Sequence, residues 1–357
     1  ANAGWNPTTR RRSSGPRHFR VHRSPPVFDS PTGRAILFHY GHEVVMKVTV
    51  IGAGNVGATA AECVARKDIV QEVVMVDIEE GMPQGKALDM MESAPVHGFD
   101  TTITGTNEYG PTEGSDVCII TAGLPRKPGM SRDDLLAKNA EIVGTVTSQF
   151  ASGSPDSALI VVSNPLDVMT YVAFEESGFE PNKVMGMAGV LDTARYRSFI
   201  AMELGCSVRD IQALLLGGHG DTMVPLPRYT TVGGIPITEL LDDDTIHAIV
   251  ERTKGGGGEI VDLMGTSAWY APGAAAAEMT ESILKDSGRI LPAAAHCDGE
   301  YGLSDLFIGV PVMLGENGIE KVIEVDLDDE EMDLMDTSAQ HVQDNLDNLE
   351  RLKEEGA

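Results

Sequence analysis

The chain has 357 residues, and its 54 acidic side chains outnumber its 27 Lys and Arg, which gives a formal net charge of −27 at pH 7. This length accommodates two domains with a sizeable core. The sequence contains no run of about 18 uncharged apolar residues. We therefore expect a cytoplasmic protein with no membrane partner, and the acidic balance argues against nucleic-acid binding by the folded body.

The first 45 residues differ in composition from the rest. They hold seven Arg and two acidic residues, Asp29 and Glu43, so residues 46–357 carry 20 basic and 52 acidic groups, a net charge of −32. We predict that residues 1–45 are a disordered or non-native extension; a transit peptide and translated sequence upstream of a start at Met46 remain open. The charge of the remainder favours a salt-adapted protein, because salt screens self-repulsion. An ordinary acidic protein is the alternative.

From Met46 onward, short apolar segments alternate with helical patterns. Strands buried on both faces are predicted at 47–51, 73–77, 117–121 and 158–162. Helices are predicted at 58–67 and 133–152, and a short segment at 183–189 closes this half. The alternation is typical of an α/β fold with a Rossmann-type, doubly wound parallel sheet, which we place at residues 46–188.

The second half of the sequence has a different texture. Its predicted elements are a helix at 192–204, a glycine-rich segment at 217–221, helices from 244 onward, two β-type segments at 302–314 and 318–325 with a hairpin turn between them, and a charged helix at 329–353. The four glycines at 255–258 are expected to kink the chain beside a helix. Residues 189–357 are therefore predicted to form a mixed α+β substrate and catalytic domain.

The cysteines exclude two classes of small scaffold. All four are far apart, at positions 63, 118, 206 and 297, and none forms a CxxC pair. This spacing argues against a zinc knuckle and against a disulfide framework, so no metal site is predicted. Cys63 and Cys118 lie in apolar segments and are interpreted as buried thiols in a reducing compartment.

Three glycines follow the first predicted strand at the spacing of a dinucleotide-binding turn. Gly52 makes the tight turn, Gly54 lets the backbone approach a pyrophosphate, and Gly57 lets the next helix pack against the strand. The N-terminal N–H groups of that helix would face the phosphates. Asp77 ends the second strand, where a carboxylate accepts hydrogen bonds from ribose hydroxyls and repels a 2′-phosphate, so NAD is favoured over NADP. A solvent-facing Asp is the alternative.

Three further clusters carry candidate chemistry. The loop at 123–132 is rich in Gly and Pro and holds Arg126 and Arg132, as a mobile lid at the carboxyl edge of the sheet would. Asp192 and Arg195, three apart at a predicted helix start, share one helix face. His219, between glycines at a strand end, is suited to acid/base work near neutral pH. Taken singly, these could also be a solvated basic loop, a local ion pair and a turn histidine.

Together the motifs resemble those of the lactate/malate dehydrogenase family, most closely the malate dehydrogenases of its lactate-dehydrogenase-like branch. The matching segments are GAGNVG at 52–57, TAGLPRKPGMSR at 121–132, VSNPLD at 162–167, LDTAR at 191–195 and GGHGD at 217–221. The resemblance runs from Met46 to about Leu352 and is lacking in residues 1–45. It implies reversible oxidation of (S)-malate to oxaloacetate, a reaction of the tricarboxylic acid cycle.

The resemblance also implies the roles of the catalytic groups. His219 would exchange a proton with the substrate oxygen, and Asp192 would orient its ring and stabilise the protonated form. Arg195 would grip the C1 carboxylate with two parallel hydrogen bonds. Arg132 would polarise the carbonyl, and Asn164 would hydrogen-bond the substrate.

The cofactor contacts follow from the same resemblance. The backbone from Val162 to Asn164 would line the nicotinamide site, and Asn139 matches a further position that contacts NAD. The full set of expected cofactor-binding residues is Gly52, Ala53, Gly54, Asn55, Val56, Gly57, Asp77, Asn139, Val162, Ser163 and Asn164.

Arg126 is the residue expected to determine whether the enzyme prefers malate or lactate. Relatives that act on lactate are expected to place an uncharged residue there, whereas an Arg pairs with the second carboxylate of malate. Leaving that guanidinium desolvated and unpaired over pyruvate would cost about 2–5 kcal/mol. The alternatives are a lactate dehydrogenase and a catalytically idle NAD-binding protein on the same fold. The family forms both dimers and tetramers, so a homodimer or homotetramer is expected.

Overall fold

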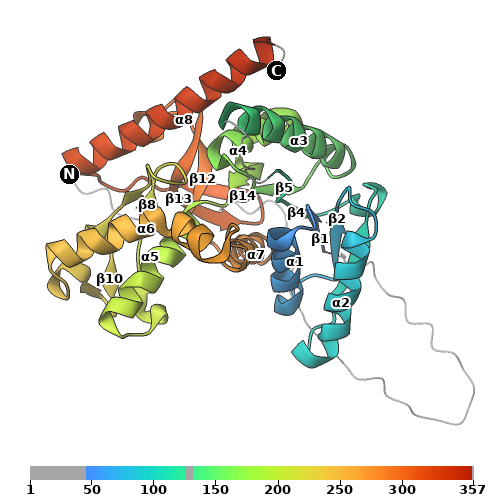
Figure 1. Ribbon diagram of the computed structural model, residues 1–357, viewed down its shortest axis with the longest axis horizontal. Coiled ribbons are helices and arrows are strands. Elements are labelled where there is room, and N and C mark those ends of the chain that lie inside the picture. The colour runs from blue at the N-terminus through green and yellow to red at the C-terminus, as the bar shows by residue number, and fades with distance from the viewer. Residues whose placement is uncertain (1–45, 125–131, 356–357) are drawn as a thin grey trace, which may run out of the picture. The chain divides into compact units, whose positions relative to one another are not determined.

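A nine-stranded sheet runs through the protein in the order β14-β13-β12-β6-β5-β4-β1-β2-β3 (Figure 1). The structure, a computed structural model, describes residues 46–124 and 132–355. Its parallel strands are β1 (Lys47–Ile51), β2 (Glu72–Val76), β3 (Thr102–Thr106), β4 (Val117–Ile120), β5 (Ala158–Val161) and β6 (Val184–Gly186). The four strands predicted in this half are present to within one residue at each end, and the doubly wound parallel sheet is confirmed.

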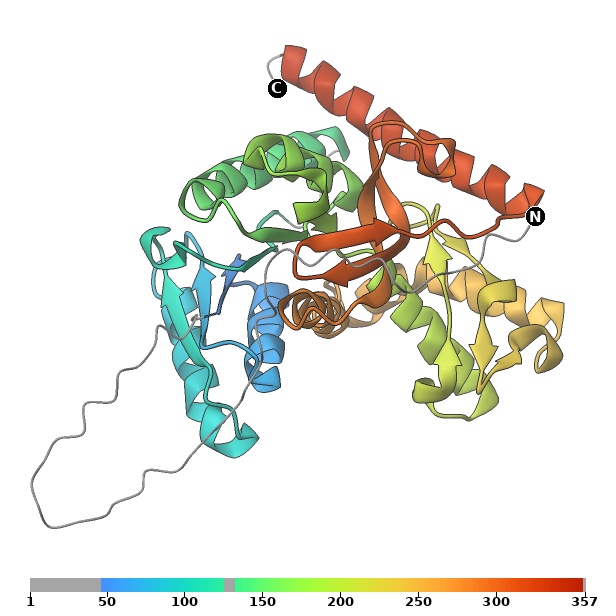
Figure 2. The same ribbon diagram turned by 180° about the vertical axis from the view of Figure 1, so that it is seen from behind.

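Three antiparallel strands extend this sheet. β12 (Arg289–Cys297) pairs with β6 through Ala294 and Gly186, β13 (Leu306–Gly315) pairs along β12, and β14 (Gly318–Val322) forms the outer edge. Figure 2 shows these strands in orange and red beside the C-terminal helix. The predicted hairpin is confirmed as β13–β14, although both segments are shorter than expected. Because of the β6–β12 pairing, one sheet belongs to both halves of the sequence.

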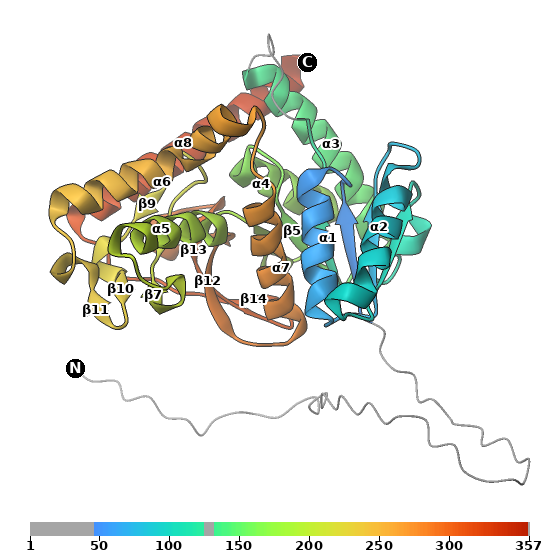
Figure 3. The same cartoon turned by 60° about the horizontal axis from the view of Figure 1, so that its bottom comes forward.

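Helices cover the two faces of the parallel sheet (Figure 3). On one face α7 (Tyr270–Leu284) lies beside α1 (Asn55–Lys67), which neighbours α2 (Met82–His97); on the other, α3 (Arg132–Gly153) and α4 (Leu166–Ser177) pack together beneath α8 (Asp329–Glu355). The approach of α7 to α1 is close, since a Cβ at Gly273 would lie 2.7 Å from the Thr59 side chain.

The remaining elements belong to the second half. They are α5 (Gly189–Leu204) and α6 (Asp243–Met264), with β7 (Ile211–Gln212), β8 (Leu215–Leu216), β9 (Val224–Pro225), β10 (Thr231–Val232) and β11 (Ile235–Pro236) in two small sheets. Short 3-10 turns occupy Gly110–Thr112, Pro181–Lys183, Val208–Asp210, Pro227–Tyr229, Ile237–Glu239 and Glu300–Gly302. α5 begins three residues before the predicted start, and α8 runs two residues past the predicted end.

The four glycines at 255–258 do not kink the chain, and that prediction is wrong. They lie inside α6, which is helical from Asp243 to Met264. Glycine costs about 1 kcal/mol relative to Ala in a helix interior, but tertiary packing outweighs such local costs. Here the side chains of Ile246, Ile249 and Thr253 are buried on the same helix, which packs against α5.

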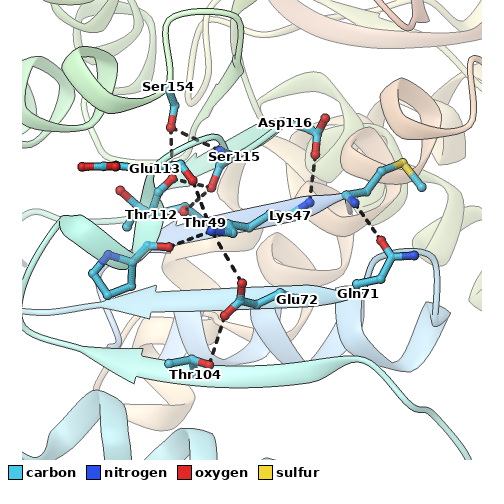
Figure 4. A network of polar contacts seen from close by, with 12 residues as sticks. Lys47, Thr49, Gln71, Glu72, Thr104, Thr112, Glu113, Ser115, Asp116 and Ser154 are labelled. Carbon is cyan, nitrogen blue, oxygen red and sulfur yellow. Dashed lines mark hydrogen bonds and ion pairs between the residues drawn. The ribbon is translucent and has the colours of Figure 1, made fainter. Parts of the chain in front are cut away.

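Polar side chains close the amino-terminal edge of the parallel sheet (Figure 4). The Lys47 ammonium donates to the carbonyl oxygens of Pro111 and Glu113 at 3.0 and 3.1 Å and lies 3.6 Å from the Glu72 carboxylate. The hydroxyls of Thr49 and Ser115 are 2.8 Å apart. These contacts occupy one end of the strands, whereas the glycine-rich turn lies at the other.

None of the helices in the described part of the chain is long and apolar enough to cross a membrane.

Candidate active site

The glycine-rich turn at 52–57 has the shape of a dinucleotide-binding turn. Gly52 has φ +100°, and a Cβ there would lie 2.7 Å from the Thr121 hydroxyl; a Cβ at Gly57 would lie 1.8 Å from the Gly52 carbonyl oxygen. At Gly54, by contrast, a Cβ would have no described heavy atom within 4 Å. No described side chain caps the start of α1. The turn thus presents free N–H groups and open space, which fits a pyrophosphate.

Two charged side chains form hydrogen bonds with the backbone of Ala53. The Asp77 carboxylate accepts the Ala53 N–H at 2.6 Å and, through its other oxygen, the Glu79 N–H at 3.0 Å. The Lys86 ammonium donates to the Ala53 carbonyl oxygen at 2.7 Å. Sequence reasoning missed Lys86, although it is the only Lys or Arg between Lys67 and Arg126. Asp77, directly after β2, therefore shapes the turn, and its contact with a ribose stays a prediction.

The residues expected around the nicotinamide gather at the carboxyl ends of β4 and β5. The buried Asn139 amide accepts the Leu124 N–H at 2.8 Å and donates to the Asn164 carbonyl oxygen at 2.7 Å, so it joins the two loops. The Ser163 hydroxyl donates to the Ala122 carbonyl at 2.6 Å, so its single proton is already used within the protein. Asn164, before a cis peptide bond to Pro165, is exposed.

Three catalytic candidates meet around one carboxylate. Asp192, only 2 % exposed on the first turn of α5, places Oδ2 2.9 Å from His219 Nδ1, and its Oδ1 accepts a hydrogen bond from Arg195 at 3.1 Å. Because an ionised carboxylate only accepts hydrogen bonds, it places the proton of a neutral ring on Nδ1 and leaves Nε2 free to exchange a proton. The predicted spacing therefore yields a His–Asp–Arg cluster.

Charge decides the protonation of the histidine. Burial alone would lower the pKa of His219, but the negative charge and hydrogen bond of Asp192, with a further contribution from the Asp167 charge, outweigh it and raise the pKa above its ordinary value. The Arg195 charge acts in the opposite direction. The two carboxylates therefore favour the protonated form of the imidazole.

Arg195 lies against the glycines of α6. A Cβ at Gly256 would be 3.3 Å from Arg195 Cδ, and one at Gly257 would be 3.8 Å from a terminal nitrogen. The Arg195 Nε is buried and has no hydrogen-bond partner among the described residues. A buried donor without a partner is costly in a folded protein, so a ligand is expected to contribute acceptors here.

The two loop arginines cannot be placed in this geometry. Arg126 lies outside the described residues. Arg132 is the first residue of α3, but its side chain also lies outside the described part. Their expected contacts with substrate remain predictions.

The cysteines lie outside the hydrogen-bonded cluster of this site. All four cysteines are free thiols; Cys118 and Cys297 are buried, whereas Cys63 is only half-buried, so its predicted burial is partial. Within the described ranges, no cluster of three or more His, Cys, Asp or Glu side chains is arranged to hold a metal ion.

A dinucleotide-binding turn, an acidic residue directly after the next strand and a hydrogen-bonded His–Asp pair are together typical of the class of NAD-dependent oxidoreductases. Comparison with known families agrees. Residues 46–186 match the lactate/malate dehydrogenase NAD-binding domain, and residues 189–353 match the lactate/malate dehydrogenase alpha/beta C-terminal domain. This chain belongs to the lactate/malate dehydrogenase family.

Individual relatives are similar over nearly their whole length. The malate dehydrogenase of Salinibacter ruber is 78 % identical over 87 % of this chain and 99 % of its own. Its solved structure superposes with a TM-score of 0.85 over 87 % of this chain and 100 % of that one, at 76 % identity. A lactate dehydrogenase from Cryptosporidium parvum, solved with lactic acid and the dinucleotide, is 39 % identical over 86 % of this chain and 98 % of its own, with a TM-score of 0.82. The shared fold thus spans both substrate preferences.

Proposed function

We propose that this chain is an NAD-dependent malate dehydrogenase that interconverts (S)-malate and oxaloacetate. The observation that carries the proposal is the His219–Asp192–Arg195 cluster, in a chain 78 % identical to a malate dehydrogenase. The cluster combines a proton-exchanging imidazole with a guanidinium suited to a carboxylate, which are the two groups that a 2-hydroxy acid requires.

The cofactor half would hold NAD mainly through backbone groups. The N–H groups after Gly54 would bind the pyrophosphate, and Asp77 the adenosine ribose, while the backbone of residues 162–164 would line the nicotinamide. When bound, NAD accepts a hydride from the carbon that bears the malate hydroxyl. The open space at Gly54 and the uncapped start of α1 support this placement.

The chain's own residues manage the proton and the charges. In malate oxidation, neutral His219 takes the hydroxyl proton at Nε2, and the Asp192 carboxylate, 2.9 Å from Nδ1, stabilises the imidazolium. In oxaloacetate reduction the proton returns to the substrate oxygen. Arg195 binds the C1 carboxylate, Arg132 polarises the carbonyl, and Asn164 donates a hydrogen bond to the substrate.

Arg126 favours malate over lactate in this proposal. A guanidinium at that position pairs with the second carboxylate of oxaloacetate and has no partner over pyruvate. A catalytically idle protein would be expected to lack part of the cluster, yet His219, Asp192 and Arg195 are present and connected by hydrogen bonds.

Partners and location complete the proposal. We propose a homodimer or homotetramer in the cytoplasm that binds a small dicarboxylate and neither nucleic acid nor membrane. Exposed apolar side chains around the junction of α6 and α7, such as Leu263 at 80 % and Tyr270 at 72 % exposure, support burial against another copy. Light scattering of the purified protein measures its mass in solution, and a monomer would contradict this part of the proposal.

The function is tested by steady-state assays with two substrates and two cofactors. We expect oxaloacetate with NADH to have the highest kcat/KM, and both pyruvate with NADH and oxaloacetate with NADPH to be much poorer. Efficient turnover of pyruvate would favour the lactate alternative, and the absence of turnover with every pair would favour the idle protein.

A further inference from the structure

Three successive residues of the histidine loop are anchored through their backbones by three different elements. Gly217 exchanges two hydrogen bonds with Gly309 of β13, at 2.8 and 3.1 Å. The Gly218 N–H donates to the Ser338 hydroxyl of α8 at 2.7 Å. The His219 N–H donates to the Asp167 carboxylate of α4 at 3.0 Å. Of these three anchors, only Asp167 carries a charge.

Asp167 is a buried carboxylate with one oxygen that has no hydrogen-bond partner among the described residues. Its side chain is 6 % exposed on the first turn of α4, and that oxygen is Oδ1. The fit is tight, because a Cβ at Gly218 would lie 3.2 Å from the oxygen that binds His219. A loop N–H needs only a neutral acceptor, such as the Ser338 hydroxyl next to it. A buried ionisable group is a costly choice for that task unless its charge is used.

We propose that Asp167 is a positioning residue for the proton-transfer histidine: its carboxylate fixes the His219 backbone from the cofactor half and supplies a second negative charge that favours the protonated ring. The inference rests on the proposed role of His219. It also gives a role to Asp167 as the last residue of the VSNPLD segment at 162–167. Asn164, in the same segment, is expected to contact the substrate.

The charged groups around the ring are few. Among the described residues they are Asp192 and Arg195 from α5 and Asp167 from α4, while α8 and β13 contribute the uncharged Ser338 and Gly309. Burial raises the pKa of Asp167 to about 6, against the opposing effect of the His219 N–H hydrogen bond, so the carboxyl is ionised at neutral pH. Asp192 and Asp167 therefore both oppose the effect of burial on His219.

The direction of the effect follows from this charge. Removing a nearby negative charge lowers the pKa of an imidazole. Oxaloacetate reduction needs the protonated ring, so its kcat/KM, which falls as pH rises through the pKa of His219, would begin to fall at a lower pH. A residue with a purely structural role would leave this pH dependence unchanged.

The test compares Asp167→Asn, which keeps an acceptor for the His219 N–H, with Asp167→Ala, which removes it. Asp221→Asn is the matched control, because Asp221 is an exposed carboxylate in the same loop. For Asp167→Asn we expect the basic limb of the kcat/KM profile to move down by about one pH unit, with kcat near the wild-type value at low pH. Asp167→Ala should show the same shift and also a lower kcat, and Asp221→Asn should show neither.

A second readout separates this inference from the proposed function. The ring nitrogens of His219 can be titrated by NMR in histidine-labelled protein without any substrate. A lower pKa in Asp167→Asn than in the wild type supports the inference even if oxaloacetate is not the substrate. Identical His219 titration and identical pH profiles in folded Asp167→Asn would overturn it. If Asp167→Ala fails to fold, the Asn variant decides the question alone.

Discussion

The two sides of the candidate site are built in different ways. On the cofactor side, the groups that would meet the ligand are mainly backbone N–H groups, and side chains such as Asp77 and Lys86 hold the turn that presents them. On the catalytic side, the ligand would meet side-chain charges, which are held by other charges: Asp192 contacts both His219 and Arg195. Changes on the first side are therefore expected to alter binding gradually, whereas changes on the second are expected to alter the chemistry sharply.

The sharpest test of this contrast is His219→Asn. The variant keeps a polar side chain of similar size but has no group that exchanges a proton near neutral pH. We expect kcat to fall by roughly 10²–10⁴-fold while the dissociation constant for NADH, measured by fluorescence, changes little. Near-normal turnover would remove His219 from the proton transfer.

Arg126→Gln tests the substrate side with a smaller effect. We expect kcat/KM for oxaloacetate to fall by at least roughly 30-fold, because the second carboxylate loses its charged partner, while kcat/KM for pyruvate is spared or improved. Steady-state kinetics with both substrates measures the change. Unchanged oxaloacetate kinetics would show that Arg126 does not contact substrate.

Asp77→Ser tests the cofactor side. Loss of a charged acceptor for the ribose is expected to relax the preference for NADH over NADPH by roughly tenfold. Asp77→Asn is the control, because an amide oxygen still accepts the Ala53 N–H without repelling a 2′-phosphate. A cofactor ratio that is the same in both variants and the wild type would place Asp77 away from the ribose.

The glycines of α6 offer a matched pair of smaller changes. Ala at Gly258, where a Cβ meets no described atom within 4 Å, should stabilise the helix by about 1 kcal/mol and raise Tm by about 2 °C without altering activity. Ala at Gly256 would press on Arg195 Cδ at 3.3 Å. We expect it to lower kcat/KM by a few-fold without a matching loss of Tm. Equal activity in the two variants would show that Arg195 tolerates the contact.

The smallest effects concern charge and the first 45 residues. With a net charge of −32 on residues 46–357, Tm is expected to rise with potassium chloride up to about 1 M, as the Debye length shrinks to about 3 Å. A chain beginning at Met46 should keep the activity and Tm of the full chain. Melting curves against potassium chloride concentration, measured for both proteins, test the two predictions. A Tm that stays constant or falls with salt would contradict salt adaptation. A large loss of Tm on truncation would show that residues 1–45 pack against the rest of the chain.

The sequence predicted the buried central strands but missed strands whose composition is less apolar. β1, β2, β4 and β5 are short apolar segments buried on both faces, so composition alone located them to within one residue. β3, at the edge of the sheet, was not predicted because its sequence, TITGT, is mostly polar. β12 was not predicted because Pro292 and the three alanines after it are uncommon in strands.

In the candidate site, local motifs were predictable from the sequence, whereas contacts between distant residues were not. Gly52, Gly54 and Gly57 follow a local spacing rule that the sequence displays directly. Asp167 stabilises His219 across 52 positions of sequence, and Gly256 owes its place to Arg195, on a different helix. These contacts join residues that are far apart in the sequence and form only when the helices pack, so a local sequence pattern cannot predict them.

The pairing of β6 with β12 has a consequence for how the molecule comes apart. The family boundary falls between residues 186 and 189, yet Gly186 pairs with Ala294 inside one continuous sheet. Neither half can detach without stripping backbone hydrogen bonds from the other, so the halves are expected to be poor modules for exchange between relatives. Calorimetry should then show a single endotherm, and NADH bound at the carboxyl edge of β1 should slow amide hydrogen exchange in β12 and β13 as well.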